Sequence, residues 1–234
     1  MSKSEKPTII ILHGWGACGS RFKEAKNLLE NRGYKVFTPD LPGFGPSRPP
    51  VNPLTLGDYV EFVKKYISKE KLERAVLVGH SFGGRVACEY AALGPKELEK
   101  LILVAPSGIK HPSIKAVVFK SVAKLGKTVF GGNESLRRLL YRVVRERDYY
   151  RASPVMRVTM SRVLQSDLRP NLNKINVSTL IVWGEKDTFV PVKDARIMER
   201  EIPHSTLKIL KNEGHLFPYE KPHKFVKIIT DYVT

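Results

Sequence analysis

The chain has 234 residues, of which 42% are hydrophobic and 27% charged, and its formal net charge is +17 at pH 7. This length can bury one hydrophobic core, and the absence of low-complexity tracts and repeats excludes fibrous and disordered proteins. No apolar run reaches the ~18 residues of a membrane-spanning helix, and two cysteines cannot form the framework of a disulfide-rich protein.

The first residues carry no pattern typical of a targeting segment. Residues 1–7 lead directly into the short apolar run Thr8–Leu12, which is too brief for the hydrophobic part of a signal peptide. We therefore expect a cytoplasmic protein. Cys18 and Cys88 lie far apart among apolar neighbours, and we expect both to be buried free thiols.

Short apolar segments rich in β-branched residues alternate with helical patterns along the chain. The expected strands are Thr8–Leu12, Lys35–Thr38, Ala75–Gly79, Leu101–Ala105, Thr179–Trp183 and Leu207–Leu210. The expected helices are Arg21–Asn31, Leu56–Glu70, Phe82–Leu93, Val192–Glu201 and Lys221–Val233. Several of the strands are continuously apolar, which indicates burial on both faces. The sequence thus predicts an α/β fold, with a mostly parallel sheet flanked by helices.

The alternation breaks between Ser107 and Asn173, where we find no convincing strand but three or four amphipathic helical patterns. We expect residues 107–173 to form a helical cap. The cap is inserted between the two parts of the core, residues 1–106 and 174–234. It is expected to sit above the edge of the sheet where the loops gather.

The expected cap is strongly basic. Between Pro106 and Lys174 there are 15 Lys and Arg residues and four acids, so this segment carries +11 of the net charge of +17. We favour a solvated positive face as the explanation. A positive cap would also attract an acidic substrate, and it could bind a nucleic acid or an anionic membrane. Three tyrosines among its arginines could stack or lie at such an interface: Tyr141, Tyr149 and Tyr150.

The clearest chemical motif follows the strand Ala75–Gly79, which runs into Gly79-His80-Ser81-Phe82-Gly83 and then into a helix. A serine in this G-x-S-x-G context occupies a tight strand-to-helix turn, with glycines two residues to either side because a Cβ would clash there. The turn lifts the hydroxyl out of the sheet, beside the positive end of the helix. We therefore predict that Ser81 is a catalytic nucleophile.

A serine nucleophile needs a base that takes the hydroxyl proton and an acid that orients this base. His215 is the preferred base because it lies in a glycine-flanked loop directly after the last expected strand. Enzymes whose nucleophile is a serine at this kind of turn have their catalytic residues in the chain order serine, acid, histidine. The acid is therefore expected on the loop after Thr179–Trp183, the strand before the last one. Asp187 is the better candidate on that loop, and Glu185 is the alternative.

Backbone donors for an oxyanion are expected where the first strand ends in the glycine-rich turn Leu12-His13-Gly14-Trp15-Gly16. Backbone N–H groups in this turn can face the nucleophile. We assign the two donors to the N–H groups of Trp15 and Phe82.

The other polar residues near these motifs have less specific roles. His13 and His80 are expected to pack or to hydrogen-bond near the turn, and Asp40 is expected to hold its own loop. The remaining histidines have no motif around them and are expected at the surface: His111, His204 and His223. No cluster of His, Cys, Asp and Glu has metal-ligand spacing, so we expect no metal.

Five ordered motifs resemble those of the α/β-hydrolase superfamily. They are H-G-W-G from His13, D-L-P-G-F-G-x-S at Asp40–Ser47, G-H-S-F-G-G from Gly79, L-I-V-W-G-E-K-D from Leu180 and G-H-x-x-x-x-E-x-P at Gly214–Pro222. The resemblance extends from Thr8 to Val233. It implies a capped hydrolase with a serine nucleophile, and its candidate substrate-pocket residues are His80, Arg85 and Leu216.

The residues around the nucleophile separate branches of this superfamily. Serine argues against the haloalkane dehalogenase and epoxide hydrolase branches, which have aspartate at this turn. The carbon–carbon bond hydrolases tend to have Asn before the nucleophile and Trp after the catalytic His, where this chain has His80 and Leu216. The menaquinone-pathway synthase branch has an arginine four residues after the serine, and Arg85 stands at that position here. That branch also has a basic pocket for an acidic substrate.

The resulting hypothesis is a serine hydrolase that cleaves carboxylic esters of small to medium size without a cofactor. Two alternatives stay open. One is a carbon–carbon bond hydrolase, or a lyase or synthase similar to that of the menaquinone pathway, acting on an acidic substrate. The other is a non-catalytic ligand- or anion-binding module on the same fold. The sequence makes no prediction about the oligomeric state.

Overall fold

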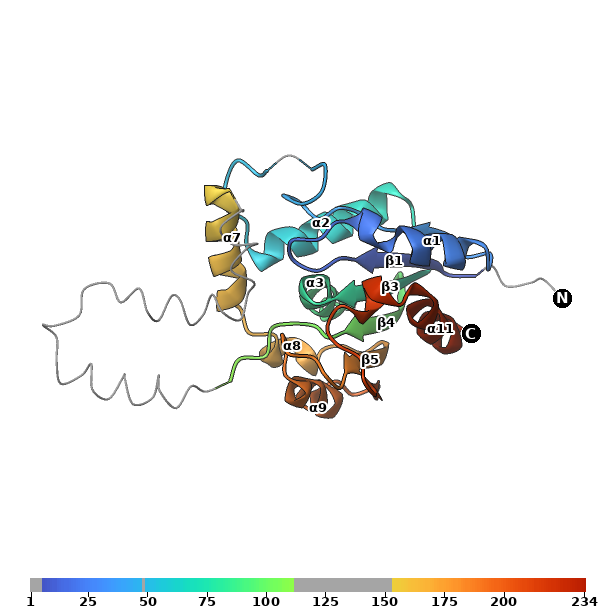
Figure 1. Cartoon of the computed structure of the whole chain (residues 1–234). Coiled ribbons are helices and arrows are strands. Elements are labelled where there is room, and N and C mark those ends of the chain that lie inside the picture. Colours follow the sequence, from blue (N-terminus) through green and yellow to red (C-terminus); the bar gives the residue numbers. More distant parts are fainter. Residues whose placement is uncertain (1–5, 48, 112–152) are drawn as a thin grey trace, which may run out of the picture.

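A six-stranded sheet forms the centre of the molecule in the computed structural model, which describes residues 6–47, 49–111 and 153–234 (Figure 1). The strands are β1 (Thr8–Leu12), β2 (Val36–Phe37), β3 (Ala75–His80), β4 (Leu98–Val104), β5 (Ser178–Gly184) and β6 (Ser205–Leu210). Their order is β2-β1-β3-β4-β5-β6, and every neighbouring pair is parallel. The predicted α/β class with a parallel sheet is confirmed.

The strand order reverses direction at β1 and β3. The chain leaves β1 toward the edge strand β2, returns to β3 on the other side of β1, and then proceeds outward to β6. Open α/β sheets bind ligands beyond the carboxyl ends of their strands, at this kind of switch point. Leu12 pairs with Gly79 in the register, so the loops that follow β1 and β3 emerge side by side.

Helices cover both faces of the sheet, as the continuously apolar strands require. Ile9 and Ile11 of β1 pack on the face covered by α1 (Lys23–Glu30) and α11 (Pro222–Val233). Ile10 and Leu12 pack on the opposite face. Three helices cover that face: α2 (Leu56–Lys69), α3 (Phe82–Ala91) and α9 (Val192–Glu201). Each fully buried aliphatic side chain of this kind stabilises the fold by about 1.5–3 kcal/mol.

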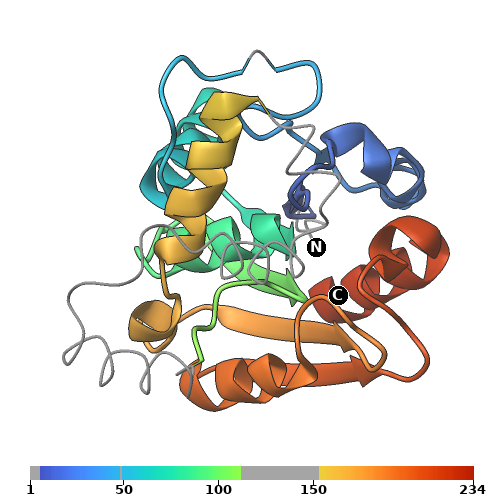
Figure 2. The ribbon, with the colours of Figure 1, turned by 60° about the vertical axis from the view of Figure 1, so that its left-hand side comes forward.

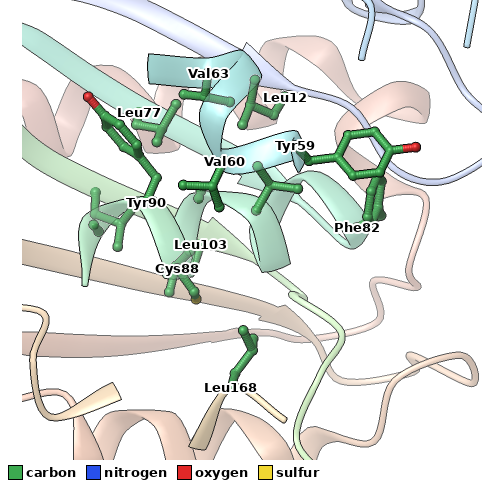
Figure 3. Packing of buried hydrophobic residues seen from close by; sticks show 14 of the residues in the cluster. Leu12, Tyr59, Val60, Val63, Leu77, Phe82, Cys88, Tyr90, Leu103 and Leu168 are labelled. Carbon is green, nitrogen blue, oxygen red and sulfur yellow. The ribbon is translucent and has the colours of Figure 1, made fainter. Parts of the chain in front are cut away.

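The start of α3 is held by its packing against α2. Thr55 caps α2 by accepting from the backbone N–H of Asp58, whose carboxylate accepts from the N–H of Thr55 in return. Figure 3 shows Tyr59 of α2 beside Phe82, the first residue of α3. The two rings meet edge to face, with centroids 4.9 Å apart and planes at 89°. This contact places the residue that follows Ser81.

Some element boundaries differ from those that the sequence predicts. The edge strand β2 has two residues rather than four, and β4 begins at Leu98 rather than Leu101. β6 begins at Ser205 rather than at the predicted Leu207. The prediction missed the first two residues because this edge strand alternates exposed and partly buried residues and is not continuously apolar. A short 3₁₀ helix, η1 (Gly19–Phe22), precedes α1. The short helix α10 (Phe217–Glu220) is not predicted from the sequence.

Two helices described after residue 152 lie within the expected cap: α7 (Pro154–Gln165) and α8 (Arg169–Leu172). Figures 1 and 2 show α7 beside α2, and the Thr159 hydroxyl accepts from the N–H of Leu54 at 3.0 Å. α8 packs against α3 and α9. Residues 112–152, which hold most of the basic residues and all three tyrosines of the expected cap, lie outside the described residues. The cap boundaries therefore stay a prediction.

Within the described part of the chain, none of the helices combines the length and the apolar character needed to cross a bilayer.

Candidate active site

Ser81 lies at the turn between β3 and α3 in a conformation that few non-glycine residues adopt, with φ 53° and ψ −110°. Such strain costs of order 1–3 kcal/mol and persists only where the surroundings impose it. Here the N–H of Ser81 donates to the carbonyl of Val104 at 2.9 Å, and its own carbonyl accepts from the N–H of Ser107 at 3.2 Å. The Ser81 side chain makes no capping hydrogen bond to α3. The hydroxyl is therefore not engaged at the N-terminus of the helix that it precedes.

Two glycines make this turn sterically feasible. A Cβ on Gly79 would come closer than 3.0 Å to the backbone of Gly83 and Gly84. A Cβ on Gly83 would come closer than 3.0 Å to the carbonyl oxygens of Leu12 and His13. The start of α3 therefore lies directly against the end of β1, as the G-x-S-x-G motif predicts.

His215 and Asp187 form a buried pair on the loops after β6 and β5. The Nδ1 of His215 lies 2.7 Å from Oδ2 of Asp187, and the side chains are 8% and 0% exposed. The other carboxylate oxygen of Asp187 accepts from the N–H groups of Phe189 and Val190 at 2.8 and 2.9 Å. Because a carboxylate accepts hydrogen bonds, Nδ1 of His215 carries a proton, and in the neutral ring Nε2 then has the lone pair.

Glu185, the alternative acid, has a different partner. Its carboxylate accepts from the N–H of Asn212 at 3.1 Å. Of the two acids on this loop, the fold brings Asp187 to His215. Because Glu185 and Asp187 are only two residues apart, their separation along the chain did not distinguish them, whereas the backbone N–H groups that bind Asp187 do.

A cavity of about 350 Å³ opens beyond the carboxyl ends of the strands. Seven of the eight predicted site residues line it, all except Asp187, which lies behind His215: Ser81, His215, Trp15, Phe82, His80, Arg85 and Leu216. Much of the remaining wall is apolar and comes from α7 and from the loop after β5: Met160, Val163, Leu164, Phe189 and Val190. The cavity therefore offers an apolar chamber with the serine and the histidine in its lining.

Among the residues that the structure describes, neither the N–H of Trp15 nor that of Phe82 has an acceptor. The orientation of the Trp15 N–H follows from that of Gly14, whose carbonyl shares a planar trans peptide with it and therefore points the opposite way.

His13 and the backbone N–H of Ala17 together hold the carbonyl of that peptide, Ala17 at 3.2 Å. The Nε2 of His13 accepts from the N–H of Leu41 at 3.0 Å, so Nδ1 carries the proton and donates to the carbonyl of Gly14 at 2.8 Å. Burial lowers the pKa of His13, which keeps the ring neutral and this arrangement intact. Asp40 holds the neighbouring segment by accepting from the N–H of Gly19 at 2.6 Å. His13 thus hydrogen-bonds near the turn, as expected, whereas the hydrogen bond of Asp40 reaches the segment before η1 rather than its own loop.

Arg85 has a structural partner that the sequence did not reveal. The side chain is buried, and its two terminal nitrogens each donate at 2.9 Å, one to the carbonyl of Val163 and one to that of Ser166. These carbonyls lie at the end of α7, where a cation is favourable because of the helix dipole. Burial lowers the pKa of Arg85 to about 10, so the group stays charged at neutral pH. Arg85 therefore ties α3 to the α7 wall of the cavity.

Tyr219 was not predicted from the sequence, although it lines the cavity. Its hydroxyl accepts from the N–H of Gly14 at 3.0 Å and lies 3.1 Å from Nδ1 of His80. No local signal marks it, because Tyr219 lies in the four-residue helix α10, which is too short to leave a periodic pattern in the sequence.

Both cysteines were expected to be buried, and this expectation is wrong for one of them. Cys88 is buried, but Cys18 is partly exposed and lines the cavity, because it precedes the short helix η1 at the rim. His111 is exposed, as expected, but its Nε2 also pairs with the buried carboxylate of Asp194. In residues 6–47, 49–111 and 153–234, no group of three or more His, Cys, Asp and Glu side chains could hold a metal ion.

Comparison with known proteins agrees with this geometry. Residues 9–228 match the model of the alpha/beta hydrolase family. The AB hydrolase superfamily protein YisY of Bacillus subtilis is 32% identical, over 96% of this chain and 90% of YisY. Monoacylglycerol lipase of Homo sapiens is 26% identical, over 97% of this chain and 75% of the lipase.

Solved structures give the same result. An esterase from Exiguobacterium antarcticum superposes with a TM-score of 0.76 at 25% identity, covering 97% of this chain and 91% of the esterase. The family match covers all six strands except Thr8, the first residue of β1, and both loops that carry Asp187 and His215. The chain belongs to the alpha/beta hydrolase family.

Proposed function

We propose that this hydrolase cleaves carboxylic esters of small to medium size through an acyl-enzyme formed on Ser81. The observation that carries the proposal is the buried pair of His215 and Asp187, which lies at the same apolar cavity as the strained serine. The monoacylglycerol lipase and the esterase described above support an ester as the bond that is cleaved.

The first half of the reaction forms the acyl-enzyme. The Oγ of Ser81 attacks the acyl carbon while Nε2 of His215 takes its proton, and the carboxylate of Asp187 stabilises the resulting imidazolium. The N–H groups of Trp15 and Phe82 donate to the oxyanion that develops on the acyl oxygen. As the tetrahedral intermediate collapses, His215 returns the proton to the leaving alcohol oxygen.

The second half consumes one water molecule. His215 takes a proton from the water as its oxygen attacks the acyl carbon, and the same two N–H groups bind the second oxyanion. Collapse of this intermediate releases the carboxylic acid and returns the proton to the Oγ of Ser81. The net reaction is ester plus water to acid plus alcohol, and no cofactor takes part.

The cavity favours esters with an uncharged acyl group. Its volume of about 350 Å³ suits a small to medium chain, and its α7 wall contributes Met160, Val163 and Leu164. Arg85 is the buried cation in the lining, but both of its terminal nitrogens are engaged with α7 carbonyls. Its Nε is also buried and has no hydrogen-bond partner among the described residues, so an acidic acyl group would have to displace the terminal bonds or reach this buried nitrogen.

A purely binding role is the weaker alternative. A binding module gains nothing from holding Ser81 at positive φ, which costs of order 1–3 kcal/mol. It also has no use for a desolvated carboxylate that holds one histidine tautomer. Both features serve a nucleophile and its base.

The test combines a fluorophosphonate probe with p-nitrophenyl esters of increasing acyl length. We expect the wild type to be labelled and to hydrolyse short and medium esters, and Ser81→Ala to lose both properties. Ser68→Ala, which removes an exposed hydroxyl at the end of α2, is the matched control and should behave as the wild type.

Three results separate the hypotheses. Absence of labelling in well-folded wild type would contradict the serine nucleophile. Labelling without ester turnover would keep the nucleophile and contradict the ester substrate. A marked preference for acyl groups that carry a carboxylate would contradict the uncharged acyl group.

A further inference from the structure

Two side chains connect three segments of the proposed active site. His80 is the last residue of β3 and directly precedes Ser81. Its Nε2 lies 2.9 Å from the backbone carbonyl of His215, and its Nδ1 lies 3.1 Å from the hydroxyl of Tyr219. That hydroxyl lies 3.0 Å from the N–H of Gly14. The chain of contacts therefore runs from the oxyanion loop through the nucleophile turn to the histidine loop.

Donor and acceptor roles in this chain have a single consistent assignment. A backbone carbonyl can only accept, so Nε2 of His80 carries the proton and donates to His215. In the neutral ring Nδ1 then accepts, and the Tyr219 hydroxyl must donate to it. The Tyr219 oxygen accepts in turn from the N–H of Gly14. Each polar group in the chain is thereby satisfied.

Burial keeps His80 in this state. The side chain is 1% exposed, and desolvation together with the neighbouring His215 ring keeps its pKa well below the usual value. Burial raises the pKa of Tyr219 to about 12, so its hydroxyl keeps the proton that it donates. Both groups therefore hold their hydrogen-bonding roles across neutral pH.

Ring packing restricts the movement of both side chains. The Tyr219 and His80 rings meet edge to face, with centroids 5.0 Å apart and planes at 89°. Phe22 packs on Tyr219 at 4.7 Å, and the guanidinium of Arg21 lies over the same ring at 4.9 Å. The His80 and His215 rings are 4.8 Å apart. The hydrogen bonds are thus held by packed rings rather than by mobile side chains.

The contact with Gly14 affects the proposed oxyanion donor. Tyr219 holds the N–H of Gly14, and His13 holds its carbonyl. That carbonyl belongs to the same peptide as the N–H of Trp15, the proposed donor. Both the N–H and the carbonyl of Gly14 are therefore held in place. The contact with the carbonyl of His215 fixes the backbone that carries the base.

We propose that Tyr219 and His80 are positioning residues that set the oxyanion loop and the His215 loop relative to Ser81. The inference rests on the proposed function, since it assigns these residues to the same reaction. Neither side chain transfers a proton to the substrate. Their effect is on the geometry of the transition state, where a misplacement of about 1 Å can cost 100-fold in rate.

Tyr219→Phe tests the proposal because it removes one hydroxyl and keeps the packed ring. We expect kcat for the best p-nitrophenyl ester to fall by roughly tenfold, with KM changed less than about twofold. Inhibition by a boronic acid that mimics the oxyanion should weaken in proportion to kcat/KM. Rates are expressed per fluorophosphonate-labelled site, so that misfolded protein does not count.

Tyr232→Phe is the matched control. It also removes a tyrosine hydroxyl with a hydrogen bond, to the Ser178 hydroxyl at 2.7 Å, but at the start of β5, which is the opposite end of the sheet. A structural effect would appear equally in both variants. The proposal predicts that kcat changes in Tyr219→Phe alone, and equal kcat in Tyr219→Phe, Tyr232→Phe and wild type would overturn it.

Two further measurements cover a Tyr219 variant that fails to fold. His80→Gln keeps one donor and one acceptor and should retain more kcat than His80→Leu; equal losses would overturn the proposal. In the wild type, ¹⁵N shifts of the His80 ring should show the neutral tautomer protonated at Nε2, and protonation at Nδ1 would overturn it without any activity assay.

The proposed function fails separately. It fails when wild-type protein is not labelled or when Ser81→Ala keeps its esterase activity. The positioning role fails when labelling and turnover are normal in the wild type and unchanged in Tyr219→Phe.

Discussion

Asp187 has two carboxylate oxygens with different tasks. One oxygen accepts from the N–H groups of Phe189 and Val190, which holds the side chain, and the other faces Nδ1 of His215. An amide in its place could keep the backbone contacts only through its oxygen. It would then present an NH₂ group to His215, which selects the histidine tautomer with Nδ1 unprotonated. The base would lose its lone pair at Nε2.

We therefore expect Asp187→Asn to lower kcat by about 10³- to 10⁴-fold while the protein stays folded. Glu185→Gln is the matched control, because its carboxylate accepts from the Asn212 N–H and does not reach His215. Its kcat should stay within about twofold of wild type. Steady-state ester hydrolysis checks both variants, and a larger loss in Glu185→Gln would mean that the acid was assigned to the wrong residue.

At the scale of elements, the turn between β3 and α3 is the most constrained part of the fold. Ser81 is held at φ 53°, and α3 begins so close to β1 that no Cβ fits at Gly83. Gly57, near the start of α2, is the opposite case, since a Cβ there would meet its nearest atom at 3.6 Å, an ordinary contact. The two glycines should respond to the same substitution with opposite signs.

Gly83→Ala is expected to lower the free energy of unfolding by at least about 2 kcal/mol, because the backbone carbonyls of Leu12 and His13 would have to move. Gly57→Ala is expected to raise it by about 0.5–1 kcal/mol, because alanine loses less entropy on forming a helix. Urea denaturation measures both changes. A Gly83→Ala variant of wild-type stability would show that the close approach of α3 to β1 is not required.

At the scale of the whole molecule, residues far apart in the chain meet around one site. Gly14 and Tyr219 are separated by 205 positions, and Arg85 joins a carbonyl 78 positions away. The site therefore depends on the complete fold. It also places two neutral histidines, His13 and His80, in the interior, where burial lowers the pKa of each below its ordinary value near 6.5.

These two histidines make stability depend on pH. Below about pH 6.5 the unfolded chain protonates both, whereas the native state does not until its lower pKa values are reached. The unfolded state then binds more protons, so the free energy of unfolding falls as the pH falls. The expected slope is about 1.4 kcal/mol per pH unit for each histidine.

Urea denaturation between about pH 5 and 7 measures this slope, in a window above the ordinary carboxylate pKa values. His80→Gln should reduce the slope by the contribution of one histidine, about 1.4 kcal/mol per pH unit, and His13→Gln should reduce it by the same amount. A stability that stays level across the window would contradict the neutral, buried state of both rings. His204→Gln, at an exposed position, is the control and should leave the slope unchanged.

The sequence predicts the fold class well because buried strands and tight turns leave local signals. Continuously apolar runs indicated β1 and β4, and the G-x-S-x-G spacing indicated the turn at Ser81. The edge strands β2 and β6 were less well bounded, since an edge strand buries fewer of its side chains and its pattern is weaker. The short helix α10 left no periodic pattern that could be recognised.

The sequence by itself determined the α/β class, the order of the motifs and the candidates Ser81, Asp187 and His215. It could do so because glycine spacing and apolar runs act over a few neighbouring residues. Only the tertiary structure paired Asp187 with His215, tied Arg85 to α7 and brought Tyr219 to Gly14. These outcomes depend on hydrogen bonds between loops that become neighbours only after the sheet has formed, and no local pattern in the chain encodes which donor will meet which acceptor.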